Sequence, residues 1–239
     1  MPEMIEEMDE AGVGTGVAPG RHRPGTEIPN DALLRLTTDY PGRFVALASV
    51  DVIDARHGTA MIDTAVGQYR FPGISLDLSV LGMRVDDRRA YPIYEHCQRY
   101  GCCVAITLSA LGARELDLVD PADLERAARD FPRVNFVSAH GSHPYVLQII
   151  AVAMKRENVW IAPDMYMTHA PGRGLYVEAA QGYLQDRMLF GTGYPYTPLR
   201  DTVERFQRLP LRETVREKLL HRNAERLLNL NRNGGTLDG

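Results

Sequence analysis

Short apolar runs alternate with amphipathic helical segments along most of this 239-residue chain, and this alternation limits the fold more than any other feature. The runs at 44–50, 73–78, 102–108 and 159–162 have the length and apolar character of buried strands. Each is followed by a segment whose apolar residues recur at helical spacing. Strands separated by helices in this way are typical of a parallel sheet covered by helices. The sequence therefore predicts an α/β fold.

Seven strands are predicted, and a closed (β/α) barrel has eight. Because the chain opens on a helix, we expect a TIM-like (β/α) barrel with seven strands visible and the first strand missing; an open doubly wound sheet is the alternative. Asn30 is placed to cap the second helix, and Pro121 after Asp120 suits the start of another. The predicted strands are 14–18, 44–50, 73–78, 102–108, 135–139, 159–162 and 188–191, and the helices 2–11, 30–40, 54–68, 90–100, 121–130, 143–155, 174–184, 199–207 and 212–228.

The length suits one barrel domain over residues 1–228, and the polar, glycine-rich residues 229–239 are expected to be a loose C-terminal tail. A missing strand would leave two sheet edges open, and open edges recruit partners. We therefore expect a homo-oligomer that covers the gap, or a chain that starts downstream of its natural beginning.

The charge pattern excludes several classes of partner. The net charge is −4, acidic and basic residues are interspersed, and no basic face for nucleic acid or polybasic run for a membrane surface is present. No apolar stretch approaches the roughly 20 residues of a membrane helix, and the acidic residues 1–10 are unlike a signal peptide. We expect a cytoplasmic protein whose three cysteines, Cys97, Cys102 and Cys103, are buried thiols; a metal site or a redox pair is the alternative.

Several segments, in order along nearly the whole chain, resemble the amidohydrolase-related family. Its members include metal-dependent hydrolases and decarboxylases of small aromatic and dicarboxylic acids, and the resemblance implies the barrel fold. The segments are 7–13, 40–44, 91–95, 130–132 leading to 139–141, 187–192 before Tyr194 and Pro195, and 223–228.

The chain departs from the family at the metal ligands. The His-x-His pair of the first strand is absent, residues 105–109 carry no histidine, and Gly193 stands where the family has an aspartate. His140 is retained, and the resemblance implies that it polarises or deprotonates water. A catalytic zinc needs about three protein ligands, and the only convergent candidates are His140, Asp77 and Asp164. We therefore predict no metal or other cofactor, with zinc or another divalent ion as the alternative.

His140 and Asp164 are the predicted catalytic residues. His140 follows a strand at the end where barrels hold their sites, and an imidazole titrates near neutrality, as a general acid or base does. Asp164 follows the next strand and would orient His140 or accept a proton. The alternatives are a histidine that bonds a loop carbonyl and an aspartate that caps a loop.

Polar residues at other strand ends are predicted to bind the substrate. Asp77 lies inside an apolar run, where a charge is costly unless it is paired, so it faces the barrel mouth or has Arg21 or Arg23 as a partner. Thr107 and Ser109 are two residues apart on one strand face, where they either bind an anionic or carbonyl group or pack against a neighbour. The predicted substrate-binding residues are Asp77, Thr107, Ser109, Tyr166, Thr192 and Tyr194.

Together these features predict an amidohydrolase-like enzyme that acts on a small organic acid or lactone, without the usual metal. Hydrolysis and carbon–carbon cleavage of the decarboxylase type both stay open. The only predicted partner besides a second copy is a small-molecule substrate. The alternative is a catalytically silent barrel that binds a ligand or serves in an assembly.

Overall fold

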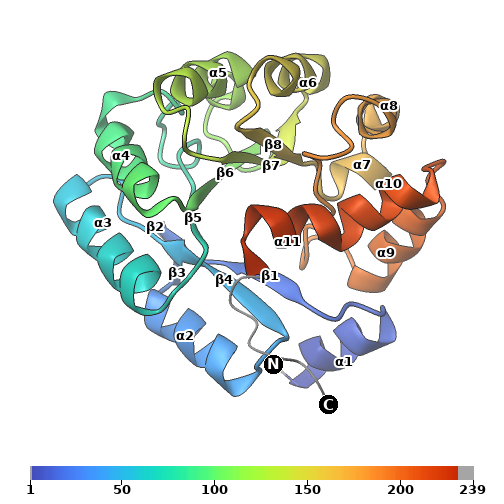
Figure 1. Ribbon diagram of the computed structural model, residues 1–239, viewed down its shortest axis with the longest axis horizontal. Coiled ribbons are helices and arrows are strands. Elements are labelled where there is room, and N and C mark those ends of the chain that lie inside the picture. Colours follow the sequence, from blue (N-terminus) through green and yellow to red (C-terminus); the bar gives the residue numbers. More distant parts are fainter. Residues whose placement is uncertain (1, 231–239) are drawn as a thin grey trace.

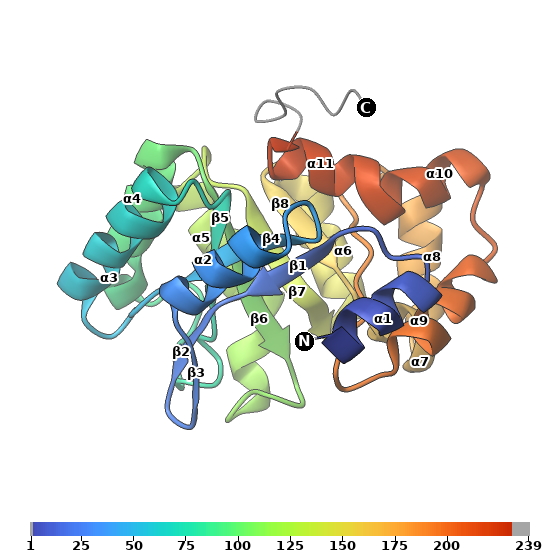
Figure 2. The same cartoon turned by 90° about the horizontal axis from the view of Figure 1, so that it is seen from below.

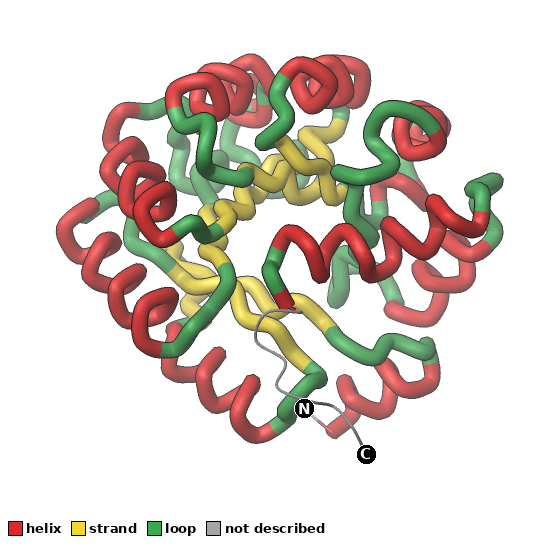
Figure 3. The backbone as a smooth tube through the Cα atoms, in the orientation of Figure 1, coloured by secondary structure: helices red, strands yellow, loops and turns green. Residues whose placement is uncertain are grey.

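The computed structural model describes residues 2–230, and within that range six parallel strands form one curled sheet surrounded by helices (Figures 1 and 3). The predicted α/β fold of TIM-like type is confirmed as an incomplete barrel. Along the sheet the strands are β1 (Gly16–Pro19), β4 (Phe44–Ser49), β5 (Gly73–Leu76), β6 (Cys103–Ser109), β7 (Phe136–His143) and β8 (Val159–Ala162). A separate antiparallel hairpin consists of β2 (Arg21–Arg23) and β3 (Thr26–Ile28).

Most helices lie where the sequence predicts them. They are α1 (Pro2–Glu10), α2 (Asn30–Asp39), α3 (Ala55–Ile62), α4 (Tyr91–Tyr100), α5 (Pro121–Asp130), α6 (Val146–Lys155), α7 (Tyr166–His169), α8 (Arg173–Gln181), α9 (Leu199–Gln207), α10 (Glu213–Glu217) and α11 (Asn223–Leu227). Wider π-helical turns follow α3 and α10, at η1 (Asp63–Gln68) and η4 (Lys218–Arg222), and short 3₁₀ turns are η2 (Arg88–Ala90) and η3 (Leu116–Val119).

Two local predictions have different outcomes. α5 begins at Pro121, as expected, and the side chain of Asp120 caps it by accepting the N–H of Ala122 at 2.9 Å. The prediction that Asn30 caps α2 is wrong: its amide donates to the carbonyl of Ser49 and accepts the Ser49 N–H, at 3.0 and 2.8 Å. Asn30 therefore connects the start of α2 to the end of β4 by two hydrogen bonds.

The predicted last strand at 188–191 reduces to a single parallel bridge between Ile161 and Met188. The N–H of Leu189 still donates to Ile161 O, but that of Phe190 donates to Leu219 O in the C-terminal helices. Those helices compete for the backbone, so the ladder stops after one pair. The strand predicted at 135–139 is longer than expected, since β7 runs to His143, and α6 therefore begins at Val146 instead of 143.

Side chains at the end of α11 fill the barrel interior near the amino-terminal ends of the strands. Leu227 and Leu228 pack with residues of five barrel segments: Leu47, Cys103 and Ala105, Val137, Trp160, and Leu189. Figure 2 shows α10 and α11 on one side of the sheet and the β2–β3 hairpin on the other, the side to which β6 points. This plug closes one end of the barrel and leaves the carboxyl end for a site.

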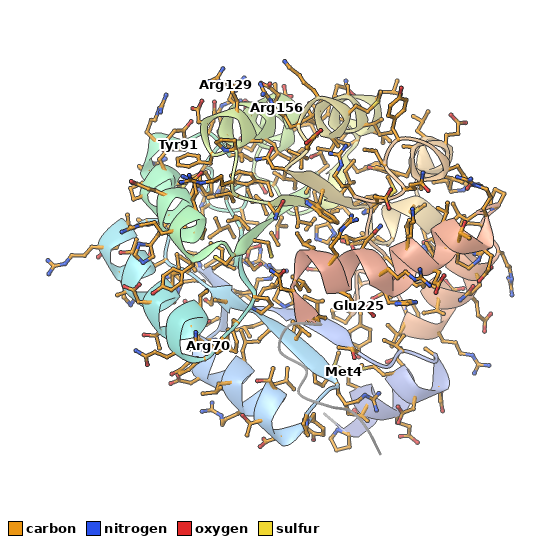
Figure 4. The ribbon with its side chains drawn as sticks, viewed as in Figure 1. Met4, Arg70, Tyr91, Arg129, Arg156 and Glu225 are labelled. Atoms are coloured by element: carbon orange, nitrogen blue, oxygen red, sulfur yellow. The ribbon has the colours of Figure 1, made fainter. Side chains whose placement is uncertain are left out.

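Polar contacts hold the outer ring of helices together. The labelled Tyr91, Arg129 and Arg156 lie on its circumference in Figure 4. The Tyr91 hydroxyl donates to Asp130 at 2.7 Å and so joins α4 to α5. Arg156, the residue after α6, donates from Nε to Glu125 of α5 at 2.8 Å and so joins α6 to α5.

Some further predictions concern the cysteines, the membrane and the tail. All three cysteines are buried and free, as expected. Among the described helices, none has the length and hydropathy needed to cross a membrane. The tail predicted at 229–239 lies outside the described residues from 231 onward.

Candidate active site

Polar side chains collect at the carboxyl end of the sheet, whereas the plugged end is apolar. Barrels hold their sites at this end because the loops after successive strands meet there. The buried polar residues on or just after the strands are Ser49, Ser75, Asp77, Ser79, Thr107, Ser109, Ser138 and Ser142. These side chains offer hydrogen-bond donors and acceptors to a polar molecule at this end of the sheet, which we call the mouth.

Arg21 reaches from the β2–β3 hairpin across the strand ends. Its Nη1 donates to Ser75 Oγ at 2.9 Å, to Asp77 Oδ1 at 3.2 Å and to Thr107 Oγ1 at 3.4 Å. Arg23 Nε lies 3.4 Å from the other oxygen of Asp77. Asp77 is only 6% exposed and is paired with both arginines. The cationic partner that the sequence predicted for this buried carboxylate is therefore present, and both candidates serve as partners.

Burial lowers the pKa of Arg21, and Asp77 opposes that shift by its negative charge. Arg23 lowers the pKa further, while Tyr196 and Asp164 raise it, so all four groups lie within electrostatic reach of the guanidinium.

His140 and Asp164, the two predicted catalytic residues, lie together in a second polar centre. His140 Nδ1 lies 2.9 Å from Asp164 Oδ2, and the same oxygen accepts the backbone N–H of His140 at 3.2 Å. Nδ1 is buried and makes no aligned hydrogen bond, so the ring contact is electrostatic. Both residues have left-handed backbone angles, with φ of 69° and 52°, a conformation that non-glycine residues adopt at a cost.

The remaining ring nitrogen of His140 is free to react. Nε2 makes no hydrogen bond to any residue between 2 and 230, and it is not among the buried atoms that lack a partner. It therefore reaches solvent, on a side chain that is 19% exposed. Proton transfer to or from a bound molecule can occur at this atom.

Gly191 makes room for the Asp164 carboxylate. A Cβ on Gly191 would lie 1.7 Å from Asp164 Oδ1, a distance that no side chain tolerates. A residue without a side chain is therefore needed here so that Asp164 can sit between the last predicted strand and His140.

Tyr166 connects the predicted Ser109 with two histidines. Its hydroxyl and Ser109 Oγ are 2.7 Å apart, and its ring stacks on that of His143, with centroids 4.4 Å apart and planes at 10°. The ring of His140 lies edge-on, at 6.3 Å. Burial raises the pKa of Tyr166, so the phenol is neutral where it contacts Ser109 and His143.

Thr192 and Tyr194 are placed differently from the other predicted residues. Thr192 Oγ1 accepts the Tyr194 N–H at 3.3 Å, and Thr197 Oγ1 donates to the Thr192 carbonyl at 2.5 Å. Tyr194 is 39% exposed. Within residues 2–230 neither side chain bonds to His140, Asp164 or Arg21, so a role in binding stays a prediction.

The sequence predicted Arg21 only as a possible partner of Asp77. It did not predict that Arg21, Ser75 or Gly191 belongs to the site. The signal for Arg21 was the buried charge of Asp77, which requires a cation. No local signal marks Gly191, because its role depends on Asp164, far away in the sequence.

The side chains of the mouth do not fit a divalent cation. Of the three expected donors, Asp77 is paired with two arginines, and Asp164 is paired with His140. Over the described range 2–230, no group of three or more His, Cys, Asp or Glu side chains is arranged to hold a metal ion. A cation among these groups would also meet the positive charge of Arg21.

The fold and sequence match known proteins. A family model described as amidohydrolase matches residues 3–230. An uncharacterized TIM-barrel protein from Bordetella bronchiseptica is 35% identical, with a TM-score of 0.91, and the match covers 96% of this chain and 82% of that one.

Two decarboxylases are more distant. A variant of 5-carboxyvanillate decarboxylase from Novosphingobium aromaticivorans, with bound manganese and 3-methoxy-4-hydroxy-5-nitrobenzoic acid, is 17% identical, with a TM-score of 0.76 over 95% of this chain and 80% of that one. At this identity the likeness shows the fold alone. A 2-amino-3-carboxymuconate-6-semialdehyde decarboxylase from Dictyostelium discoideum is 27% identical over 77 residues, which are 32% of this chain and only 21% of that enzyme.

Proposed function

Since the chain belongs to the amidohydrolase family, we propose that it is an enzyme that hydrolyses or decarboxylates a small organic acid or lactone at the carboxyl end of its barrel. The observation that carries this proposal is the contact of His140 with Asp164, at 2.9 Å, beside an accessible Nε2. The distant decarboxylases support the class of reaction.

The chemistry assigned to His140 is proton transfer. In a decarboxylation, the carbon–carboxylate bond breaks, its electron pair stays on carbon, and a proton from Nε2 of the imidazolium goes to that carbon. In a hydrolysis, Nε2 takes the proton of a water whose oxygen attacks the carbonyl, and then gives it to the leaving oxygen. In both, Asp164 stabilises the imidazolium by its charge and fixes the ring.

The substrate would lie between His140 and the polar strand ends. Thr107 and Ser109 on β6 and Tyr166 beside them offer hydroxyl groups, and Asp77 holds the arginines in place. Thr192 and Tyr194 would border the same opening. We propose that the reaction needs no metal, because the acidic groups of the mouth are occupied by arginine and histidine.

The test is a turnover assay on purified protein with a panel of aromatic acids, dicarboxylic acids and small lactones. Released CO₂ and ring-opened product are measured separately, with chelator and with added Mn²⁺ or Zn²⁺. We expect turnover of at least one compound, a loss of about 10²–10⁴-fold in His140→Gln, and no loss in the matched surface variant His221→Gln. Full activity of His140→Gln would refute the assigned role, and activity only with added metal would refute the metal-free reaction.

A catalytically silent barrel is the second candidate. It is favoured by the pairing of Arg21 with Asp77 and of His140 with Asp164, since these side chains already have protein partners without a substrate. Absence of turnover over the whole panel, with unchanged ligand binding in His140→Gln, would support it.

We also propose a homo-oligomer in the cytoplasm, with no nucleic-acid or membrane partner. Among the described strands β1 pairs on one side only, with β4, and an open edge favours association. Light scattering of the full chain tests the oligomer; a monomer at micromolar concentration would contradict it.

A further inference from the structure

We propose that Arg21 is the substrate-anchoring cation of this site and that it binds a carboxylate through Nε and Nη2. This inference rests on the proposed function, and it selects an organic acid over a neutral lactone as the substrate class.

The guanidinium of Arg21 is hydrogen-bonded through Nη1, whereas its Nε and Nη2 edge makes no such bond within residues 2–230. Nη1 carries all three hydrogen bonds, to Ser75, Asp77 and Thr107. Nε and Nη2 have no hydrogen-bond partner in the described part of the chain, and neither is buried without one, so both reach solvent. Nε and Nη2 form a fork that matches the two oxygens of a carboxylate.

The charges beside this open edge favour one more negative group. Arg21 and Arg23 carry two positive charges and share a single carboxylate, that of Asp77. Arg23 Nε is itself buried without an aligned hydrogen bond. Asp164 is paired with His140. A bound monoanion would therefore balance the arginine side of the mouth.

The location also suits the proposed chemistry. Arg21 bonds to Thr107 on β6 and so reaches the middle of the curled sheet, while His140 lies on β7, the next strand. A carboxylate on Arg21 would hold its parent molecule over the strand ends that carry His140 and Ser109. A fixed guanidinium thus supplies positive charge at these strand ends.

The test is calorimetric titration of the full-length protein with benzoate and glutarate, with neutral benzamide and with inorganic phosphate. We expect the carboxylates to bind and benzamide not to bind at the same concentration. Arg21→Lys keeps the charge beside Asp77 but loses the fork, so it should fold normally and bind carboxylates about tenfold to hundredfold more weakly. Arg133→Met, at an exposed arginine just before the amino-terminal end of β7, is the matched control and should bind like wild type.

Arg21→Met combined with Asp77→Asn removes the cation without leaving the carboxylate behind and should abolish binding. Equal carboxylate affinity in wild type and Arg21→Lys, or no binding of either carboxylate, would overturn the proposal. Phosphate that binds while both carboxylates do not would overturn it as well. Failure of the wider function looks different: carboxylates would bind through Arg21, but no compound would be turned over and His140→Gln would change nothing.

Discussion

Replacement of Gly191 by alanine tests whether the contact between Asp164 and His140 depends on a residue without a side chain at position 191. The added Cβ would lie 1.7 Å from Asp164 Oδ1 and 2.9 Å from its Cγ. Ordinary contacts between such atoms are about 3.5 Å, so the carboxylate must move by well over 1 Å. It then leaves the position in which it meets Nδ1 of His140 at 2.9 Å and accepts the His140 N–H at 3.2 Å.

The cost follows from what is lost. A hydrogen bond to a charged group contributes about 1.5–3 kcal/mol, and both side chains are largely shielded, at 19% and 14% exposed. We therefore expect Gly191→Ala to lower the free energy of unfolding by about 2 kcal/mol. In a chain of this size, that corresponds to roughly 4–8 °C in Tm.

Thermal and urea unfolding of the variant measure this effect. Gly14→Ala is the control, since a Cβ there meets nothing within 4 Å, and it should change stability by less than about 0.5 kcal/mol. In an Asp164→Ala background the added methyl group has no carboxylate to displace, so Gly191→Ala should cost almost nothing more. An unchanged Tm in the single variant, or full additivity in the double variant, would refute this account of Gly191.

Three further outcomes are expected. Asp77→Asn should lower the free energy of unfolding by about 3 kcal/mol, because it leaves two arginines without their carboxylate. Adding Arg21→Met should restore part of this loss, as measured by urea unfolding. A larger loss in the double variant would contradict this explanation. Tyr166→Phe removes the 2.7 Å bond to Ser109 and should cost about 1 kcal/mol, with little further loss on adding Ser109→Ala; additive losses would show that the bond contributes nothing. Burial raises the pKa of the Cys103 thiol to about 12, so it should resist a thiol reagent at pH 8 until the chain is unfolded. Its contribution to stability is present below the ordinary thiol pKa of about 8.5 and is lost as pH rises toward 12, which pH-dependent unfolding measures; rapid labelling of the native protein would refute the burial.

Local pattern was sufficient for much of the architecture. The apolar runs that became β4, β6 and β8 are buried on both faces, and a strand of that kind is recognisable without knowing its neighbours. The cost of a buried charge likewise marked Asp77 as a residue in need of a cation. The predicted contact of Asp164 with His140 followed from both residues standing at the ends of adjacent parallel strands.

Long-range pairing decided the rest. The hairpin of β2 and β3 is too short to leave a periodic signal, yet it carries Arg21 to Ser75 and Thr107, 54 and 86 residues along the chain. Residues 188–191 have strand-like composition but lose their ladder because Phe190 donates to Leu219. The sequence by itself therefore determined the class of fold and the residue types at the strand ends, since these depend on burial along each segment. Only the tertiary structure decided which charges meet at the mouth and which nitrogens stay free, since those depend on distances between segments that no local pattern encodes.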